Sequence, residues 1–299
     1  RMSVMCLRIF CLVIGLSLLA CTSGRPILDP ERSAALAGSA REASTQSSPP
    51  LMSEAAVKRP ATRPQPADLA ELAVLAALAS PERPAADRER DGSRQSAAVL
   101  HFFGVTPGMT VLDLYSGGGY YSEILSRLVG PKGRVVAHNN TPYLQFAKDE
   151  LATRYAAGRL PNVEQLIAEN NALSLPVATF DVVLMTNVYH DVHLVDEKSG
   201  WVRIDAPKML ATIYSSMRPG AVLGVVDHVA TPGTSLEQAA ALHRIDPELL
   251  KRDLQAAGFA FDGESDVLRN PADDGSRPVF DPAVRGHTNQ VVYRFRRPR

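Results

Sequence analysis

The stretch TVLDLYSGGGYYSE, residues 110–123, decides the fold class of this 299-residue chain. An apolar segment runs into one acid, Asp113, then into the glycines Gly117, Gly118 and Gly119, and then into an amphipathic segment that begins near Tyr120. Glycine adopts positive φ readily and has no Cβ, so the run favours a tight turn that leaves backbone amides uncovered. Strand–turn–helix units of this kind build α/β folds, which bind ligands at the carboxyl edge of a parallel sheet.

The rest of the chain continues the alternation of strand and helix. We predict strands at residues 110–115, 134–138, 163–168, 181–187, 221–228, 259–266 and 290–295. Helical stretches separate the first five strands, and residues 246–257 form one more helix. The last two strands have no helix between them, which favours an antiparallel pair at the edge of an otherwise parallel α/β sheet.

The glycine run does not match a dinucleotide site. Such a site needs the pattern G-x-G-x-x-G and an acid about twenty residues further on. Here Ser122 occupies the position of the third glycine, and the second strand is followed by Asn139 and Asn140 rather than by an acid. A nicotinamide- or flavin-dependent oxidoreductase is therefore the weakest of the functions that we consider.

The pattern instead resembles the class I S-adenosylmethionine-dependent methyltransferases, whose first motif is an acid followed by spaced glycines, as Asp113, Gly117 and Gly119 are here. Tyr115 replaces the family's first glycine. The resemblance implies a Rossmann-like, seven-stranded, mostly parallel sheet with helices on both faces and an antiparallel edge strand. It also implies S-adenosyl-L-methionine as the cofactor and methyl transfer as the reaction. The alternative is a glycine turn that serves only strand-to-helix packing.

Further positions fit the same cofactor by resemblance. Asn139 stands where the family usually has an acid that holds the ribose hydroxyls; a neutral hydrogen bond there would weaken binding by roughly 1 kcal/mol, or about fivefold. Glu169 and Asn170 match the motif that accepts a hydrogen bond from the adenine amino group, although either can be a solvated loop residue. Asn187, at the end of the strand 181–187, completes the predicted cofactor set with Asp113 and Gly117–Gly119.

Polar residues at the carboxyl ends of strands face the ligand crevice of such sheets. We place Tyr189, His190, Asp191 and His228 at the methyl-accepting side, and expect residues 242–246 to join them. An acceptor that must lose a proton needs a base, which His190, His228 or Asp191 can supply, while Tyr189 shapes the pocket. Each histidine also has an ordinary structural interpretation.

Metal binding by His190, Asp191 and His228 is chemically reasonable, because imidazole and carboxylate are suitable ligands. The chain has no short-range pair such as H-x-x-x-H, and we predict no metal site.

A wider resemblance covers residues 80–299. Together with residues 102–105, 117–121 and 268–273, the clusters above are similar to a bacterial group of predicted, often exported, methyltransferases. The balance of 32 basic and 32 acidic residues gives no field that attracts nucleic acid, so we expect a small-molecule acceptor. A non-catalytic nucleoside-binding or scaffold lipoprotein that retains the fold is the main alternative.

The N-terminal region predicts export. The apolar run 9–20 is too short to cross a bilayer and suits the core of a signal peptide over residues 1–20. Residues 18–21, Leu-Leu-Ala-Cys, resemble a lipobox, which implies lipidation of Cys21 and attachment to the bacterial envelope on its periplasmic face. Residues 21–66 then form a tether, residues 67–104 helices that cover the cofactor site, and residues 105–299 the methyltransferase domain.

The start codon decides this localisation. Arg1 is not a normal initiator, so we expect translation from Met2 or Met5. A start at Met52 would remove the signal and leave a cytoplasmic protein.

Overall fold

The fold was analysed in a computed structural model, which describes residues 65–299. The predicted signal peptide, the lipobox with Cys21 and nearly all of the predicted tether lie outside the described residues. Within residues 65–299, no helix has both the length and the apolar character that a membrane span requires.

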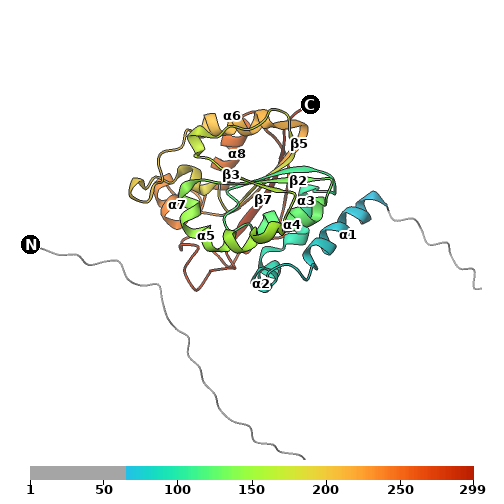
Figure 1. Cartoon of the computed structure of the whole chain (residues 1–299). Helices are drawn as coiled ribbons and strands as arrows, with labels where there is room; N and C mark the ends of the chain where they lie inside the picture. The colour runs from blue at the N-terminus through green and yellow to red at the C-terminus, as the bar shows by residue number, and fades with distance from the viewer. Residues whose placement is uncertain (1–64) are drawn as a thin grey trace, which may run out of the picture. The chain divides into compact units, whose positions relative to one another are not determined.

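A seven-stranded sheet forms the centre of the described region (Figure 1). Its strands are β1 (Thr110–Leu114), β2 (Arg134–Asn139), β3 (Val163–Ile167), β4 (Phe180–Thr186), β5 (Met217–His228), β6 (Ala260–Ser265) and β7 (Gln290–Arg296). Their order is β3-β2-β1-β4-β5-β7-β6, with β7 antiparallel to both neighbours and the first five strands parallel. The predicted Rossmann-like architecture and the antiparallel pair at the edge are confirmed.

Helices cover both faces of the sheet (Figure 1). Before β1 come α1 (Pro66–Leu78), α2 (Ala85–Arg94) and α3 (Ser96–Phe103), and the crossovers contain α4 (Tyr120–Val129), α5 (Thr141–Arg154), α6 (Ala206–Ser216), α7 (Leu236–Leu242) and α8 (Pro247–Ala256). Strand side chains alternate between two cores. One core packs against α6 and α8, and the other against α1, α3 and α4.

The buried face of α1 differs from the one that its leucine repeat predicts. Leu69, Leu72 and Leu75 recur at helical spacing but are 54%, 56% and 46% exposed. Val74 and Ala77 are buried instead, in the core that α1 shares with α3 and α4. Small side chains let a helix approach its neighbours closely, which explains why this face is the inner one.

The strand order reverses between β1 and β4, because the chain leaves β1 toward β2 on one side and later returns to β4 on the other. Ligands of open α/β sheets bind in the crevice at such a reversal, outside the carboxyl ends of the strands. Asp113 in β1 and Asn187 just after β4 therefore flank the expected crevice.

Candidate active site

The loop between β1 and α4 takes the shape that its glycines predict. Gly117 and Gly119 have φ of 56° and 79°, in the left-handed region that glycine occupies without steric cost. Gly119 is the N-cap of α4 and has no side chain that could accept a hydrogen bond from the first amides of that helix. Nothing lies within 4 Å of the position where a Cβ on Gly117 would stand, so the backbone is open to a ligand there.

Tyr115 reproduces the backbone of the glycine that it replaces. Its φ is 53°, a left-handed conformation that costs a non-glycine residue about 1–3 kcal/mol. The side chain is buried away from the loop, with its ring centroid 5.3 Å from that of His138 and 5.2 Å from that of Tyr143. Burial of the aromatic ring offsets the backbone strain, so this departure from the family pattern leaves the loop intact.

Asp113 is a fully buried acid behind the loop. Its Oδ2 accepts a 2.6 Å hydrogen bond from the Ser122 hydroxyl of α4, whereas its Oδ1 has no partner. Burial raises the pKa of Asp113 to about 6, because the Ser122 bonds and the positive charges of Arg94 and Arg154 offset desolvation only in part. The side chain is ionised for the most part at neutral pH and presents one free oxygen.

Asn139 ties the glycine loop to the end of β2. Its Oδ1 accepts from the Gly117 amide at 2.9 Å, and its Nδ2 donates to the Gly117 carbonyl at 3.0 Å and to Ser116 Oγ at 3.1 Å. The amide group is thus occupied by the loop itself. The second lone pair of Oδ1 can still accept a hydrogen bond from a ribose hydroxyl.

A buried arginine, Arg154, binds the glycine loop. Arg154, the last residue of α5, donates through Nε to the Gly118 carbonyl and through Nη1 to Asp87 of α2 and Glu123 of α4, at 2.8 and 2.6 Å. Side chains of Glu150 and Arg154 fill the space where Cβ atoms on Gly118 and Gly119 would stand. These two glycines are therefore required by packing, and α2 is linked to the loop through charge pairs.

The remaining predicted cofactor residues lie at neighbouring strand ends. Glu169 is exposed, and its Oε1 accepts from the Thr141 amide at the start of α5. Asn170 and Asn187 each carry a buried Oδ1 without a partner, as Asp113 does. Unpaired buried acceptors cost about 1–3 kcal/mol each, so a ligand that donates hydrogen bonds to any of these oxygens would be stabilised there.

The three histidine-containing segments converge, as the sequence order predicts. The ring centroid of His190 lies 6.0 Å from that of His228 and 5.5 Å from that of His243. His190 and Asp191 belong to the short helix η3 (His190–His193) after β4, His228 ends β5, and His243 caps α7.

Asp227 fixes the orientation of His190. Its Oδ1 lies 2.7 Å from His190 Nδ1, and its Oδ2 accepts from the His190 amide at 2.8 Å. Burial alone would lower the pKa of His190, but the carboxylates of Asp227 and Asp191 outweigh it and raise that pKa to about 9. Burial lowers the pKa of His228 to about 3, and its Nδ1 lies 2.7 Å from Thr288 Oγ1.

Tyr189 does not join this cluster. Its hydroxyl donates to Asp253 of α8 at 2.9 Å, and its ring packs beside His193. The tyrosine that contacts the cluster is Tyr143 of α5, whose hydroxyl donates to Asp191 Oδ2 at 2.6 Å. The sequence carries no sign of Tyr143, whereas Asp227 could have been found from its place beside His228 at a strand end.

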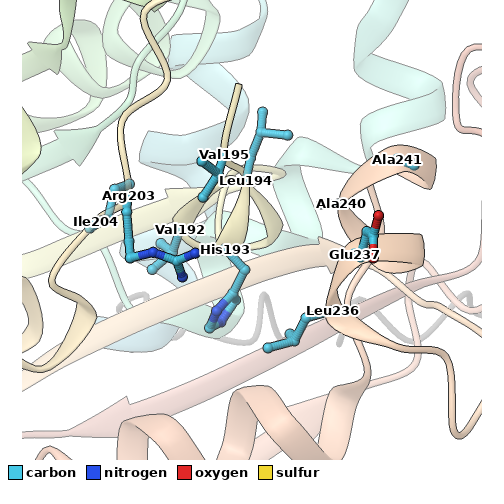
Figure 2. Close-up of a pocket in the computed structure, with 10 residues that line it drawn as sticks. All are labelled: Val192, His193, Leu194, Val195, Arg203, Ile204, Leu236, Glu237, Ala240 and Ala241. Atoms are coloured by element: carbon cyan, nitrogen blue, oxygen red, sulfur yellow. The ribbon is translucent and has the colours of Figure 1, made fainter. Parts of the chain in front are cut away.

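A cavity of about 530 Å³ opens beside the cluster, between the segment that contains η3 and helix α7. In Figure 2 the side chains of His193, Arg203 and Leu236 point into this space. The other lining residues are Val192, Leu194, Val195, Ile204, Glu237, Ala240 and Ala241. Its wall is thus mainly apolar, with one imidazole, one cation and one carboxylate.

Comparisons with known proteins agree with this geometry. Residues 91–214 match the family model of protein-L-isoaspartate(D-aspartate) O-methyltransferases. The chain is 34% identical over 125 residues to the ubiquinone/menaquinone biosynthesis C-methyltransferase UbiE of Escherichia coli O1:K1 / APEC, which covers 42% of this chain and 44% of that protein. Over these parts of its sequence the chain is similar to class I S-adenosylmethionine-dependent methyltransferases.

The chain is also similar to UbiE of Marinomonas sp. (strain MWYL1), at 29% identity over 64% of this chain and 68% of that protein. Among solved structures it is similar to a SAM-dependent methyltransferase from Aquifex aeolicus, at 24% identity and a TM-score of 0.46. The match covers 67% of this chain and 87% of that protein. A second similar structure is phosphoethanolamine N-methyltransferase 2 from Haemonchus contortus in complex with S-adenosyl-L-methionine, at 16% identity and a TM-score of 0.49. The match covers 69% of this chain and 53% of that protein. The chain spans less than half the length of the E. coli UbiE that it matches.

Proposed function

We propose that the chain binds S-adenosyl-L-methionine at the glycine loop and transfers its methyl group to a small molecule. The observation that carries this proposal is the set of three unpaired buried oxygens, on Asp113, Asn170 and Asn187, each in a strand or just after one on the carboxyl side of the sheet. S-adenosylmethionine offers hydroxyl and amino donors for such acceptors. The residues present therefore fit the cofactor of the family.

Within this proposal, Asp113 holds the cofactor with Asn170 and Asn187, and Gly117 leaves space for it because no side chain occupies that position. The bound cofactor supplies a methyl group that its sulfonium already activates, so orientation of the acceptor can account for much of the rate, about 7–11 kcal/mol for well-aligned reactants. His190, Asp191 and His228 act at the acceptor, and Asp227 is a positioning residue that holds the His190 ring.

The cavity beside η3 and α7 is the proposed acceptor pocket. Apolar walls with a few polar groups are typical of small-molecule sites. Arg203 and Glu237 give it both signs of charge, which fits an acceptor with an apolar body and a polar group. The printed names of the UbiE relatives refer to quinone biosynthesis, and a small aromatic acceptor is consistent with such a pocket.

Methyl transfer separates this proposal from a binding module without turnover. The purified chain is incubated with methyl-labelled S-adenosylmethionine and a small-molecule extract, and label in the extract is measured. We expect wild-type protein to transfer label and His190→Ala to lose most of the transfer while still binding the cofactor. Cofactor binding without transfer to any fraction would favour the non-catalytic alternative.

We also propose that the domain is exported and held at the envelope by a lipid on Cys21. The support is the sequence pattern of residues 8–21, since the structure describes only residues 65–299. Mass spectrometry of the native protein tests this: a lipidated N-terminal Cys21 is expected, and a native chain that keeps residues 2–20 without lipid would contradict it.

A further inference from the structure

We propose that His190, Asp191 and His243 form a binding site for one divalent transition-metal ion of the zinc type. One ligand atom from each residue lies within 4.8 Å of the other two. The three residues come from two segments: η3 supplies His190 and Asp191, and the end of α7 supplies His243. Two imidazoles and one carboxylate form a donor set that zinc uses in catalytic sites.

The spacing of these atoms fits a metal better than it fits hydrogen bonds. Asp191 Oδ1 lies 3.4 Å from His190 Nε2 and 3.6 Å from His243 Nδ1. Zinc bonds of about 2.0–2.2 Å at tetrahedral angles set neighbouring ligand atoms about 3.3–3.6 Å apart. Hydrogen bonds between nitrogen and oxygen are usually 2.7–3.2 Å long. Both observed distances are thus long for a direct bond and close to the spacing around a metal.

The buried carboxylate of Asp227 prepares His190 as a ligand. Its Oδ1 is 2.7 Å from His190 Nδ1, so a proton on Nδ1 donates to it and leaves the Nε2 lone pair directed at Asp191. Metal-bound histidines usually donate their second ring nitrogen to a carboxylate in this way, which fixes the tautomer and the ring orientation.

Asp191 is prepared in the same manner. Its Oδ2 accepts from the Tyr143 hydroxyl at 2.6 Å, which leaves Oδ1 for the metal. Asp191 and Asp227 are both buried. Once a metal has displaced the Nε2 proton of His190, the two carboxylates contribute two negative charges beside neutral imidazoles, which a divalent cation balances.

The third ligand, His243, is fixed in place by contacts of its own segment. His243 has φ of 53°, a strained conformation that persists only where surrounding contacts fix it. Its neighbour Arg244 is buried and binds Asp273 through two nitrogens, at 2.9 and 3.0 Å, and the His243 ring packs at 5.0 Å from that of Phe280. The His243 side chain is 32% exposed, so an ion can enter from this side.

Three protein ligands leave one tetrahedral position for water or a substrate atom. A metal there would bind the acidic oxygen or thiol of an acceptor and ease loss of its proton to solvent. This role rests on the proposed methyl transfer, whereas the metal site itself does not.

The test is a titration of tag-free, chelator-treated full-length protein with Zn²⁺, without S-adenosylmethionine, followed by Co²⁺ substitution and visible spectroscopy. We expect one ion per chain and the bands of tetrahedral Co²⁺. His190→Ala, His243→Ala and Asp191→Asn should each weaken Zn²⁺ binding by at least about 100-fold, and Asp227→Asn by about 10–100-fold. His243→Cys should restore binding, because a thiolate is also a zinc ligand.

His101→Ala and His287→Ala are the matched controls, since both side chains are exposed and distant in sequence from the site. Circular dichroism shows which variants fold. His243→Ala and His243→Cys are the decisive pair of variants, because His243 is partly exposed and its substitution disturbs the fold least. Absence of a saturable site, or undiminished binding by His243→Ala, would overturn the proposal. A separate titration with S-adenosylmethionine on the metal-free protein shows whether the cofactor site fails independently.

Discussion

Asp113 couples folding to pH through a buried carboxyl group. The pKa of about 6 in the folded protein lies above the ordinary value of 3.8, so the contribution of Asp113 to stability is full below about pH 4 and is lost as pH rises through 6. The loss amounts to about 3 kcal/mol. Urea unfolding of wild type and Asp113→Asn between pH 4 and 8 measures it: the variant should gain stability relative to wild type as pH rises. A pH-independent difference would contradict this.

Tyr115 contributes through its ring rather than through its hydroxyl, whose contact with Met209 Sδ is a weak one of 3.5 Å. Tyr115→Ala keeps a left-handed non-glycine residue and empties part of the core, so we expect a loss of about 3–5 kcal/mol in the free energy of unfolding. Tyr115→Phe should lose less than about 1 kcal/mol. Denaturant titration measures the free energy of unfolding of both variants. Equal losses in the two variants would show that the hydroxyl, and not the ring, makes the contribution.

At the residue scale, the sequence predicts backbone conformation where a motif requires it, but it does not predict which hydrogen-bond partners the side chains have. The glycine run required a turn at residues 117–119, and the turn is present. The same reasoning could not show that Asn139 bonds to the loop, or that Tyr189 turns toward α8 while Tyr143 reaches Asp191. Those choices depend on neighbours supplied by other elements.

Arg154 joins three elements, because it binds Asp87 of α2, Glu123 of α4 and the Gly118 carbonyl from the end of α5. Arg154→Met would remove one counter-ion from each of two buried carboxylates, while Asp87 keeps Arg90 and Glu123 keeps Arg127 and Arg159. We therefore expect a loss of about 1–3 kcal/mol, the cost of leaving buried groups short of a partner. Arg134→Met is the matched control, since the Arg134–Glu164 pair is exposed on both sides and should change stability by less than about 1 kcal/mol. Thermal and urea unfolding measure the stability of both variants. Equal losses of stability would contradict a stabilising role of the Arg154 ion pairs.

At the element scale, strands were predicted closely because apolar runs between turn residues define them. The exception is β5, which begins at Met217 rather than at residue 221. Arg218, Pro219 and Gly220 read as a turn, but Met217 pairs with Phe180 across a register irregularity before regular pairing resumes at Val222. In α1 a leucine repeat and a face with Val74 and Ala77 occur on the same helix, and the second is the buried one.

At the scale of the whole molecule, strand order brings distant segments together. The sequence placed polar clusters at the ends of predicted strands, and their convergence followed from the topology of a parallel sheet. The distances among His190, Asp191 and His243 did not follow, because they depend on how α7 returns to the sheet. The sequence therefore indicated a cofactor site and an acceptor side but no metal centre.

Calorimetric titration of the purified chain with S-adenosyl-L-methionine and its demethylated product tests the central claim most directly. The account predicts saturable binding of both, near one molecule per chain, with at least about tenfold weaker binding by Asp113→Ala and no effect of the exposed substitution His287→Ala. Absence of binding by a folded wild-type chain, or equal affinity of Asp113→Ala, would contradict a cofactor site at the glycine loop.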